Sequence, residues 1–185
     1  MNKMREIRIE KVTLNIGTGE AGEKLEKAKQ LLSLITGAKP VTNKSTSRIP
    51  NWSVRPGLEL GVKVTIRGKK AEEVLSRLLQ ARENTLNDKA FDNYGNFSFG
   101  LTEYIDIDGM TYQPEIGSMG LEAAVTIERK GFRIKRRKYL KKQVPDRHRI
   151  TKEESMEFVK SKFNVIFEEE EEKWLQKIMR KFSSN

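Results

Sequence analysis

The sequence has no cysteine among its 185 residues and a single histidine, His148. The absence of cysteine excludes disulfides, thiolate zinc sites and cysteine nucleophiles. No stretch approaches the roughly 18 consecutive apolar residues of a membrane-spanning helix. The N-terminal residues also lack the apolar core of a signal peptide. We therefore expect a protein of the cytoplasm.

Acidic residues are too few to balance the basic ones, since 26 Asp and Glu face 36 Lys and Arg and leave a net charge of +10. The excess lies in residues 39–70, with Glu59 as the one acid, and in residues 129–150, with Asp146 as the one acid. Such segments predict a polyanionic partner, above all nucleic acid, whereas a membrane surface would need a wider apolar stripe. The candidate RNA contacts of the second segment are Arg129, Lys130, Arg133, Lys135, Arg136, Arg137, Lys138, Lys141, Lys142, Arg147, His148 and Arg149.

Apolar and polar residues alternate along several short stretches, as they do in strands that bury one side only. This alternation is typical of an antiparallel sheet with one face open to solvent. Apolar residues at helical spacing, with Gly37 as a stop and Thr151 as the start of a capping box, predict helices. Strands are predicted at residues 12–16, 58–66, 97–101, 121–127 and 163–167, and helices at residues 20–36, 69–86, from 151 onward and in the C-terminal tail.

These elements predict one α+β domain over residues 1–167, with a mainly antiparallel sheet, helices packed on one face and an open face that binds RNA. An acidic, amphipathic helical tail is predicted at residues 168–185. Residues 42–57 fit neither period and contain two prolines, which predicts a long mobile loop between two strands. The open face should present hydroxyls, amides and cations, which suit 2′-hydroxyls and phosphates, from Lys11, Thr13, Asn15, Lys63, Thr65 and Arg67.

One glycine-rich stretch, residues 17–22, matches the G-x-G-x-x-G pattern of a dinucleotide-binding turn. That pattern needs an acid about 20 residues further on to hold a ribose, and the sequence there, GAKPVTNKS, has none. Glu20 and Glu23 would also repel a pyrophosphate. His148 has no evident carboxylate partner, and the calcium-like stretch at Asp106 lacks the glutamate of its twelfth position. We therefore predict a tight turn, with no catalysis, cofactor or metal.

Five stretches occur in the order and spacing of one known family, and together they cover roughly residues 4–167. On these motifs the chain resembles the large-subunit ribosomal protein five family, the universal 5S-rRNA-binding proteins, in its archaeal form. The archaeal assignment depends on the long basic insertion after Gly131, which bacterial members lack. The motifs are MREIRIEKVTLNIGTGE, LLSLITGAKPVTNKS, IPNWSVRPGLELGVKVTIRG, FDNYGNFSFGLTE and YQPEIGSMGLEAAVTIERKGFRIKRRK.

The resemblance implies a structural constituent of the large ribosomal subunit that binds 5S rRNA and large-subunit rRNA in the central protuberance. It also implies contacts with other 5S-associated ribosomal proteins, with P-site tRNA through the loop at residues 42–57, and with a small-subunit head protein through an inter-subunit bridge. The 5S-rRNA residues, with three added from an amide-rich stretch, are Asn15, Lys39, Thr42, Asn43, Lys44, Lys63, Thr65, Arg67, Asn93, Tyr94 and Asn96. The tRNA loop residues are Ser47, Arg48, Trp52 and Arg55, and the bridge residues are Ile116, Gly117, Ser118, Met119 and Gly120.

Two alternative functions remain open on the sequence. A free-standing RNA-binding or annealing module outside the ribosome would bind many RNAs with similar affinity, so competition with bulk tRNA distinguishes it. A nucleotide-dependent enzyme built on residues 17–22 would bind NAD or ATP, which a calorimetric titration would detect.

Overall fold

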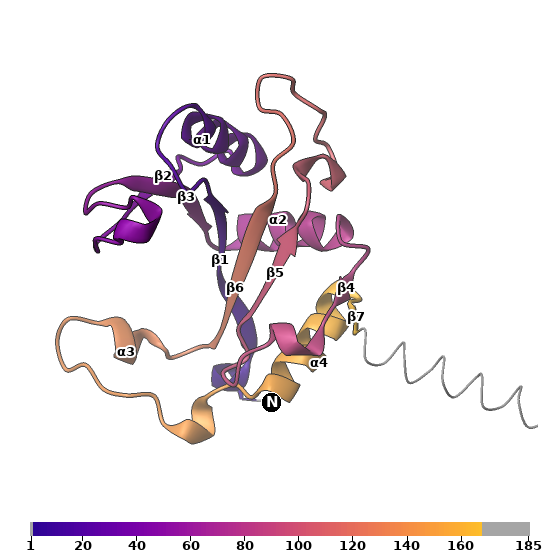
Figure 1. The fold of residues 1–185 in the computed structure, drawn as a ribbon. Helices are drawn as coiled ribbons and strands as arrows, with labels where there is room; N and C mark the ends of the chain where they lie inside the picture. Colours follow the sequence, from indigo (N-terminus) through magenta and orange to yellow (C-terminus); the bar gives the residue numbers. More distant parts are fainter. Residues whose placement is uncertain (1, 168–185) are drawn as a thin grey trace, which may run out of the picture.

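The computed structural model describes residues 2–167, so the predicted helical tail at residues 168–185 lies outside the described residues. A five-stranded sheet forms the centre of the fold, and its strands follow the order β2-β3-β1-β6-β5 (Figure 1). Every pair of neighbours in this sheet is antiparallel. The strands are β1 (Ile7–Gly17), β2 (Val41–Lys44), β3 (Glu59–Ile66), β5 (Phe97–Leu101) and β6 (Leu121–Arg129).

Three longer helices lie beside the sheet, and the first and third of them show the terminal signals that the sequence predicts. The first ends at Gly37, which has φ 58° and donates its backbone N–H to the carbonyl of Ser33. The third begins with the predicted capping box, in which the side chains and backbones of Thr151 and Glu154 bond reciprocally. The helices are α1 (Glu23–Thr36), α2 (Lys69–Gln80) and α4 (Lys152–Phe163), with a single short turn, α3 (Arg133–Arg136), between β6 and α4.

The hydrophobic core lies between the sheet and the helices, as the alternation predicts. Val12 and Leu14 of β1 are completely buried, and so are Leu32 of α1 and Leu75 of α2. Each such side chain contributes about 1.5–3 kcal/mol through the removal of its apolar surface from water. The other side of β1 and β3 carries polar residues that stay in contact with solvent. The prediction of an α+β fold with one open sheet face is therefore confirmed.

Two predicted elements are shorter than their patterns indicate, the second helix at its end and the last strand at its start. The second helix stops at Gln80 rather than Leu86 because Glu83 and Asn84 adopt left-handed φ values of 57° and 56°. Leu86 instead lies in β4 (Thr85–Leu86), which pairs in parallel with β7 (Ile166–Phe167). The strand predicted over residues 163–167 is correspondingly shorter, because Phe163 is the last residue of α4.

The predicted long loop at residues 42–57 starts later, because residues 42–44 belong to β2. Its base is closed by two bonds, from Ser45 N to the Leu58 carbonyl and from Gly57 N to the Ser45 carbonyl, each of 2.8 Å. A bridge between Ile49 and Val54 and a 3₁₀ turn, η2 (Pro50–Trp52), organise its tip. The loop is thus an ordered hairpin extension at one end of the sheet.

The glycine-rich turn at residues 17–22 connects β1 to α1, as predicted, and the dinucleotide-binding alternative fails on topology. That site needs a second strand parallel to the one before the turn. Both neighbours of β1, however, are antiparallel to it. Thr18 instead fixes the turn by donating its backbone N–H to the carbonyl of Leu60 at 3.0 Å. Within residues 2–167 no helix has the length and apolar character needed to cross a membrane.

Candidate RNA-binding surfaces

The open face of the sheet presents the polar row that the alternation predicts. Asn15 of β1 lies opposite Lys63 of β3, and Thr13 lies opposite Thr65 two pairs further along, on the same face. Lys63, Thr65 and Arg67 are exposed, whereas the alternate positions of β3 are buried. Cations, hydroxyls and an amide therefore share one flat surface, which suits the phosphates and 2′-hydroxyls of RNA.

Asn15 is held in one orientation by its neighbours on two other strands. Its amide oxygen accepts a 3.1 Å bond from the side chain of Asn43 on β2, and its amide nitrogen donates a 3.3 Å bond to Glu122 on β6. Gly61 of β3 pairs with Asn43 of β2 and contributes no side chain to this face. The missing side chain leaves room for Asn43 to reach across β3 to β1, so two predicted contact residues form one unit.

The other residues predicted from the first basic segment lie on the edge strand β2 or in the loops beside it. Thr42 donates to Glu59 at 3.3 Å, and the ammonium group of Lys44 lies 3.5 Å from the same carboxylate. Lys39, just before β2, is exposed. In the hairpin loop Trp52 is 74% exposed, and the exposed residues around it include the other three predicted loop residues, Ser47, Arg48 and Arg55.

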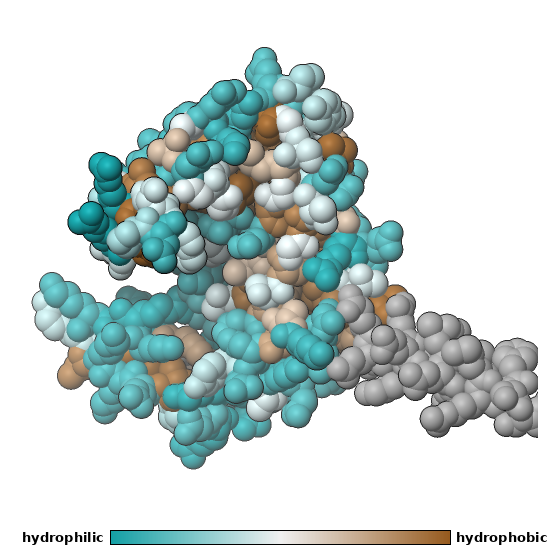
Figure 2. All heavy atoms as spheres, viewed as in Figure 1, coloured by the Kyte–Doolittle hydropathy of each residue, from teal (hydrophilic) through white to brown (hydrophobic). Residues whose placement is uncertain are grey.

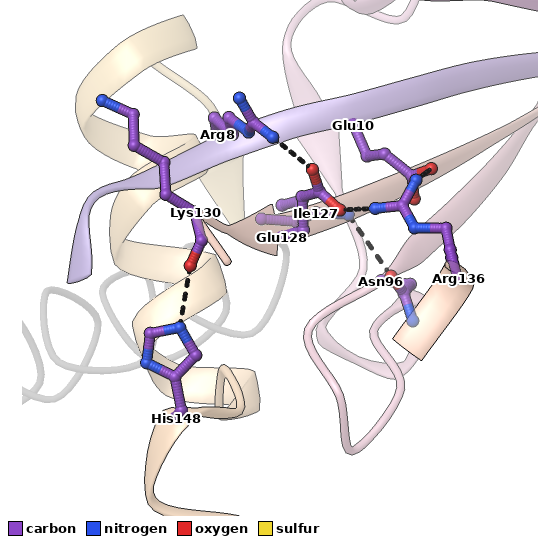
Figure 3. Close-up of polar contacts among 8 residues, drawn as sticks. All are labelled: Arg8, Glu10, Asn96, Ile127, Glu128, Lys130, Arg136 and His148. Atoms are coloured by element: carbon purple, nitrogen blue, oxygen red, sulfur yellow. Dashed lines mark hydrogen bonds and ion pairs between the residues drawn. The ribbon is translucent and has the colours of Figure 1, made fainter. Parts of the chain in front are cut away.

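A basic arm, residues 130–149, leaves β6, forms α3 and returns to α4 through η5 (Asp146–His148). Figure 1 shows the arm extending beside the lower end of the sheet. Its two sides are joined by a 3.1 Å bond from Lys142 N to the carbonyl of Ile134. At its base His148 Nε2 donates to the carbonyl of Lys130 at 2.9 Å (Figure 3). The only histidine thus has a structural role at this site.

The arm and the open face together line a solvent-open cavity of about 750 Å³. Lys11 and Thr126 line it from the sheet, and Lys135, Lys141 and Lys142 line it from the arm. Figure 2 shows that hydrophilic side chains dominate the arm and the hollow that separates it from the upper part of the molecule. The basic arm and the open face of the sheet therefore line a common space, which periodicity alone could not predict.

Four cations of the basic segment form ion pairs with acidic side chains. Arg129 pairs with Glu154 at 2.6 Å, Lys130 with Glu6 at 2.5 Å and Arg149 with Asp146 at 3.0 Å. The hydrogen bond from Lys130, together with its charge, lowers the pKa of the Glu6 carboxyl below its ordinary value. The fourth cation, Arg136, contacts carboxylates of both β1 and β6.

Arg129 is only 5% exposed, so the prediction that it contacts RNA is wrong. A buried guanidinium already paired with a carboxylate cannot reach a phosphate without leaving that charge unpaired. The other cations of the segment are exposed, and within residues 2–167 they have no acidic partner: Arg133, Lys135, Arg137, Lys138, Lys141, Lys142 and Arg147. These seven make the arm the most strongly basic surface of the described chain.

The amide-rich stretch at residues 93–96 is divided between the surface and the fold. Asn96 is engaged internally, since its side chain donates to Asp92 at 2.8 Å and accepts from the backbone N–H of Ile127 at 3.3 Å. Asn96 thus ties this stretch to β6 while it also lines the cavity beside the arm, and its contact with RNA stays a prediction. Asn93 and Tyr94 are exposed, and the guanidinium of Arg149 lies 5.4 Å from the Tyr94 ring centre, as in a cation–π contact.

The predicted bridge segment is also divided. Ile116 is 4% exposed and belongs to the core, which contradicts its prediction as a contact residue. Met119 packs against the core, and its carbonyl accepts a 3.2 Å bond from Tyr104 N. Ser118 and Gly120 are exposed and Gly117 is partly exposed, so these three positions can meet a partner.

Sequence reasoning missed the acidic partners of the arm. Glu128 continues the polar side of β6, where alternation favours exposure to solvent, yet it is buried beneath the arm. Glu10 lies at a bulge of β1, between Ile9 and Lys11, where the register shifts. Neither position carries a local signal, because their partner Arg136 follows Glu128 by 8 residues and Glu10 by 126 and meets both only in the folded chain. Among residues 2–167, no group of three or more His, Asp or Glu side chains could hold a metal ion.

Comparisons with known proteins identify the family. Residues 2–55 match the model for ribosomal protein L5, and residues 59–158 match the model for the C-terminus of the same ribosomal family. The large ribosomal subunit protein uL5 of Sulfurisphaera tokodaii is 51% identical over 91% of this chain and 96% of its own length. The uL5 of Nanoarchaeum equitans is 51% identical over 88% of this chain and 96% of its own length, and that of Methanosphaera stadtmanae is 44% identical over 91% and 100%.

These matches cover almost the whole described chain, including the glycine-rich turn, the open face and the basic arm. The proteins matched are ribosomal proteins and not enzymes, which confirms the prediction of a chain without catalytic activity. The chain belongs to the ribosomal protein L5 family, as its motifs predict.

Proposed function

We propose that this protein is a structural constituent of the large ribosomal subunit that binds 5S rRNA with its open sheet face and further rRNA with its basic arm. The observation that carries the proposal is the common space between these two surfaces, lined by Lys11 on one side and by Lys135, Lys141 and Lys142 on the other. An RNA that enters this space meets cations from both sides. The partners proposed are 5S rRNA, large-subunit rRNA and the other ribosomal proteins associated with 5S rRNA.

The mechanism proposed is positioning. Phosphate contacts supply affinity and fix orientation, while a rigid surface selects the shape of the RNA. The fixed amide of Asn15 and the hydroxyls of Thr13 and Thr65 can bond 2′-hydroxyls, which DNA lacks. The arm cations, by contrast, do not select the shape of the RNA; they attract its phosphates through their charge.

We further propose that the hairpin loop contacts P-site tRNA and that residues 117–120 contribute to an inter-subunit bridge with a small-subunit head protein. The loop offers Trp52, whose ring is largely exposed, between two exposed cations, Arg48 and Arg55. An exposed aromatic between cations is suited to a nucleic-acid partner, because it stacks while the cations pair with phosphates.

The proposed function is tested first by binding of the full-length protein to 5S rRNA in an excess of bulk tRNA, at near-physiological salt. Specific ribosomal binding predicts an affinity that survives the competitor. If the excess tRNA abolished 5S rRNA binding, the result would favour the alternative, a general RNA-binding or annealing module.

The open face is tested by the double variant Lys63→Ala and Arg67→Ala. We expect weaker 5S rRNA binding and a salt dependence shallower by about 1–2 units, since each phosphate contact contributes roughly 0.7–0.9. A charge-matched control is Lys89→Ala with Lys162→Ala, because Lys162 pairs with Glu72 of α2 on the helical side. Equal changes in both double variants would show that only net charge matters and would count against the open face.

Deletion of residues 48–55 separates the hairpin loop from the open face. The bond between Gly57 N and the Ser45 carbonyl closes the loop at its base, outside the deleted residues. Three residues, Thr46, Ser47 and Pro56, would then join Ser45 to Gly57. We expect 5S rRNA affinity to stay within about twofold, since the deleted residues lie beyond the sheet, while tRNA contact in the assembled ribosome is lost. Loss of 5S binding would mean that the loop belongs to the 5S site.

A further inference from the structure

A buried carboxylate lies where the basic arm meets the open sheet face. Glu128 of β6 is 4% exposed, although Glu122 on the same side of the same strand is exposed. A carboxylate is buried at a large cost unless it is paired and hydrogen-bonded. Glu128 is paired twice, with Arg8 of β1 at 2.7 Å and with Arg136 of α3 (Figure 3).

Arg136 connects the arm to two strands at once. One guanidinium nitrogen bonds to Glu10 of β1 and another to Glu128 of β6. Figure 3 shows the side chain reaching from α3 to the two carboxylates on the sheet. The planar fork of arginine is suited to such two-point contacts. Four charges, Arg8, Glu128, Arg136 and Glu10, therefore form one network between the sheet and the arm.

The arm needs such a connection because its own charges oppose order. Seven of its cations have no acidic partner within the described residues, and like charges held close together repel one another. Tyr139 and Leu140 at the tip are exposed, so the tip has no hydrophobic anchor. Beyond the arm's base, the arm meets the open face through the buried side chain of Val144 and through the ion pairs of Arg136.

We propose that Glu128 is a positioning residue for RNA binding, which holds Arg136 and thereby keeps the arm cations over the open face before RNA arrives. The inference rests on the proposed RNA-binding function. It predicts an effect opposite to simple electrostatics. Removal of a negative charge from an RNA-facing surface ordinarily strengthens binding, because the charge repels phosphates. Removal of Glu128 releases the arm and weakens binding.

The first test uses hydrogen–deuterium exchange of the free full-length protein. Glu128→Gln is compared with Glu122→Gln, which removes the same charge from the same face of β6 and contacts only Asn15 among the described side chains. Exchange in the arm, where Lys142 N bonds to the Ile134 carbonyl, is expected to accelerate about threefold or more in Glu128→Gln and to stay unchanged in Glu122→Gln. Unchanged exchange in Glu128→Gln would overturn the proposal.

The second test measures 5S rRNA binding by Glu128→Gln and by Glu157→Gln, which removes the same charge from an exposed position on α4. Glu128→Gln is expected to bind about threefold to tenfold more weakly, the factor obtained when a third to a tenth of the molecules keep the arm in place. Glu157→Gln is expected to bind as tightly as the unmodified protein. Binding by Glu128→Gln that equals or exceeds that of Glu157→Gln would show that Glu128 acts only through its charge and would overturn the proposal.

A third comparison works from the arm, in case Glu128→Gln lowers the melting temperature of the whole fold. Arg136→Gln is matched by Arg137→Gln, because Arg137 is exposed and bonds only to the carbonyl of Leu140 within the arm, at 2.9 Å. A larger loss of affinity and faster arm exchange in Arg136→Gln support the proposal, and equal effects overturn it. Failure of the unmodified protein to bind 5S rRNA would refute the proposed function instead, while the exchange data on the free protein would still decide the role of Glu128.

Discussion

Ribosomal RNA binding is expected to weaken about 100-fold at roughly 0.15 M salt when four lysines of the basic arm are replaced by glutamine, namely Lys135, Lys138, Lys141 and Lys142. All four side chains are exposed and lack an acidic partner within residues 2–167. Each phosphate contact adds roughly 0.7–0.9 to the salt slope, so four contacts add about 3. Between 1 M and 0.15 M salt such a slope is equivalent to about two to three powers of ten in affinity.

The measurement is a salt titration of binding, carried out separately with 5S rRNA and with large-subunit rRNA, which also shows which RNA the arm meets. The matched control replaces the same four lysines by arginine, keeps the charge and is expected to retain affinity within about threefold. None of the four belongs to the core, so the melting temperature should not change. A glutamine variant with the salt slope of the unmodified protein would show that the arm does not contact phosphates.

The sheet and its open face could be predicted because the signals there are local. The alternation of Leu14 with Asn15 and of Val64 with Thr65 assigns each residue to a face without knowledge of its partners. The structure confirms these faces, and it places Asn15 directly opposite Lys63. The end of α1 at Gly37 could likewise be predicted, since glycine adopts the left-handed conformation of a helix terminus at little cost.

The differences from expectation concern residues whose environment depends on contacts formed only in the folded chain. Arg129 and Glu128 look like exposed charges in the sequence, and they are buried because Glu154 and Arg136 fold back onto them. Asn96 looks like a free amide in the sequence, but its side chain is hydrogen-bonded to Asp92 and to the backbone N–H of Ile127. No period of two or 3.6 residues contains such information. The space between arm and sheet likewise involves the ion pairs of Arg136 with Glu10 and Glu128.

A single methyl group at Gly61 is expected to destabilise the fold by about 1–3 kcal/mol. The Cβ of Gly61→Ala would lie 2.7 Å from the carbonyl oxygen of Ile16 and 3.3 Å from Cα of Gly17. These are backbone atoms of β1, the strand paired with Gly61, so no side chain can rotate away to relieve the contact. For a chain of this length the melting temperature should fall by about 2–4 °C per kcal/mol.

Gly100→Ala is the matched control, because Gly100 lies on β5 in the same sheet and a Cβ there would meet no atom within 4 Å. Its alanine should leave stability unchanged or raise it by up to about 1 kcal/mol, since alanine reduces the entropy of the unfolded chain. Both variants are measured by thermal denaturation and by 5S rRNA binding. The methyl group at Gly61 also separates β1 from β3 where Asn43 reaches Asn15, so this variant should lose affinity even below its melting temperature. Equal stability of the two variants would show that β1 and β3 move apart freely, and the open face would then not be the rigid surface that shape selection requires.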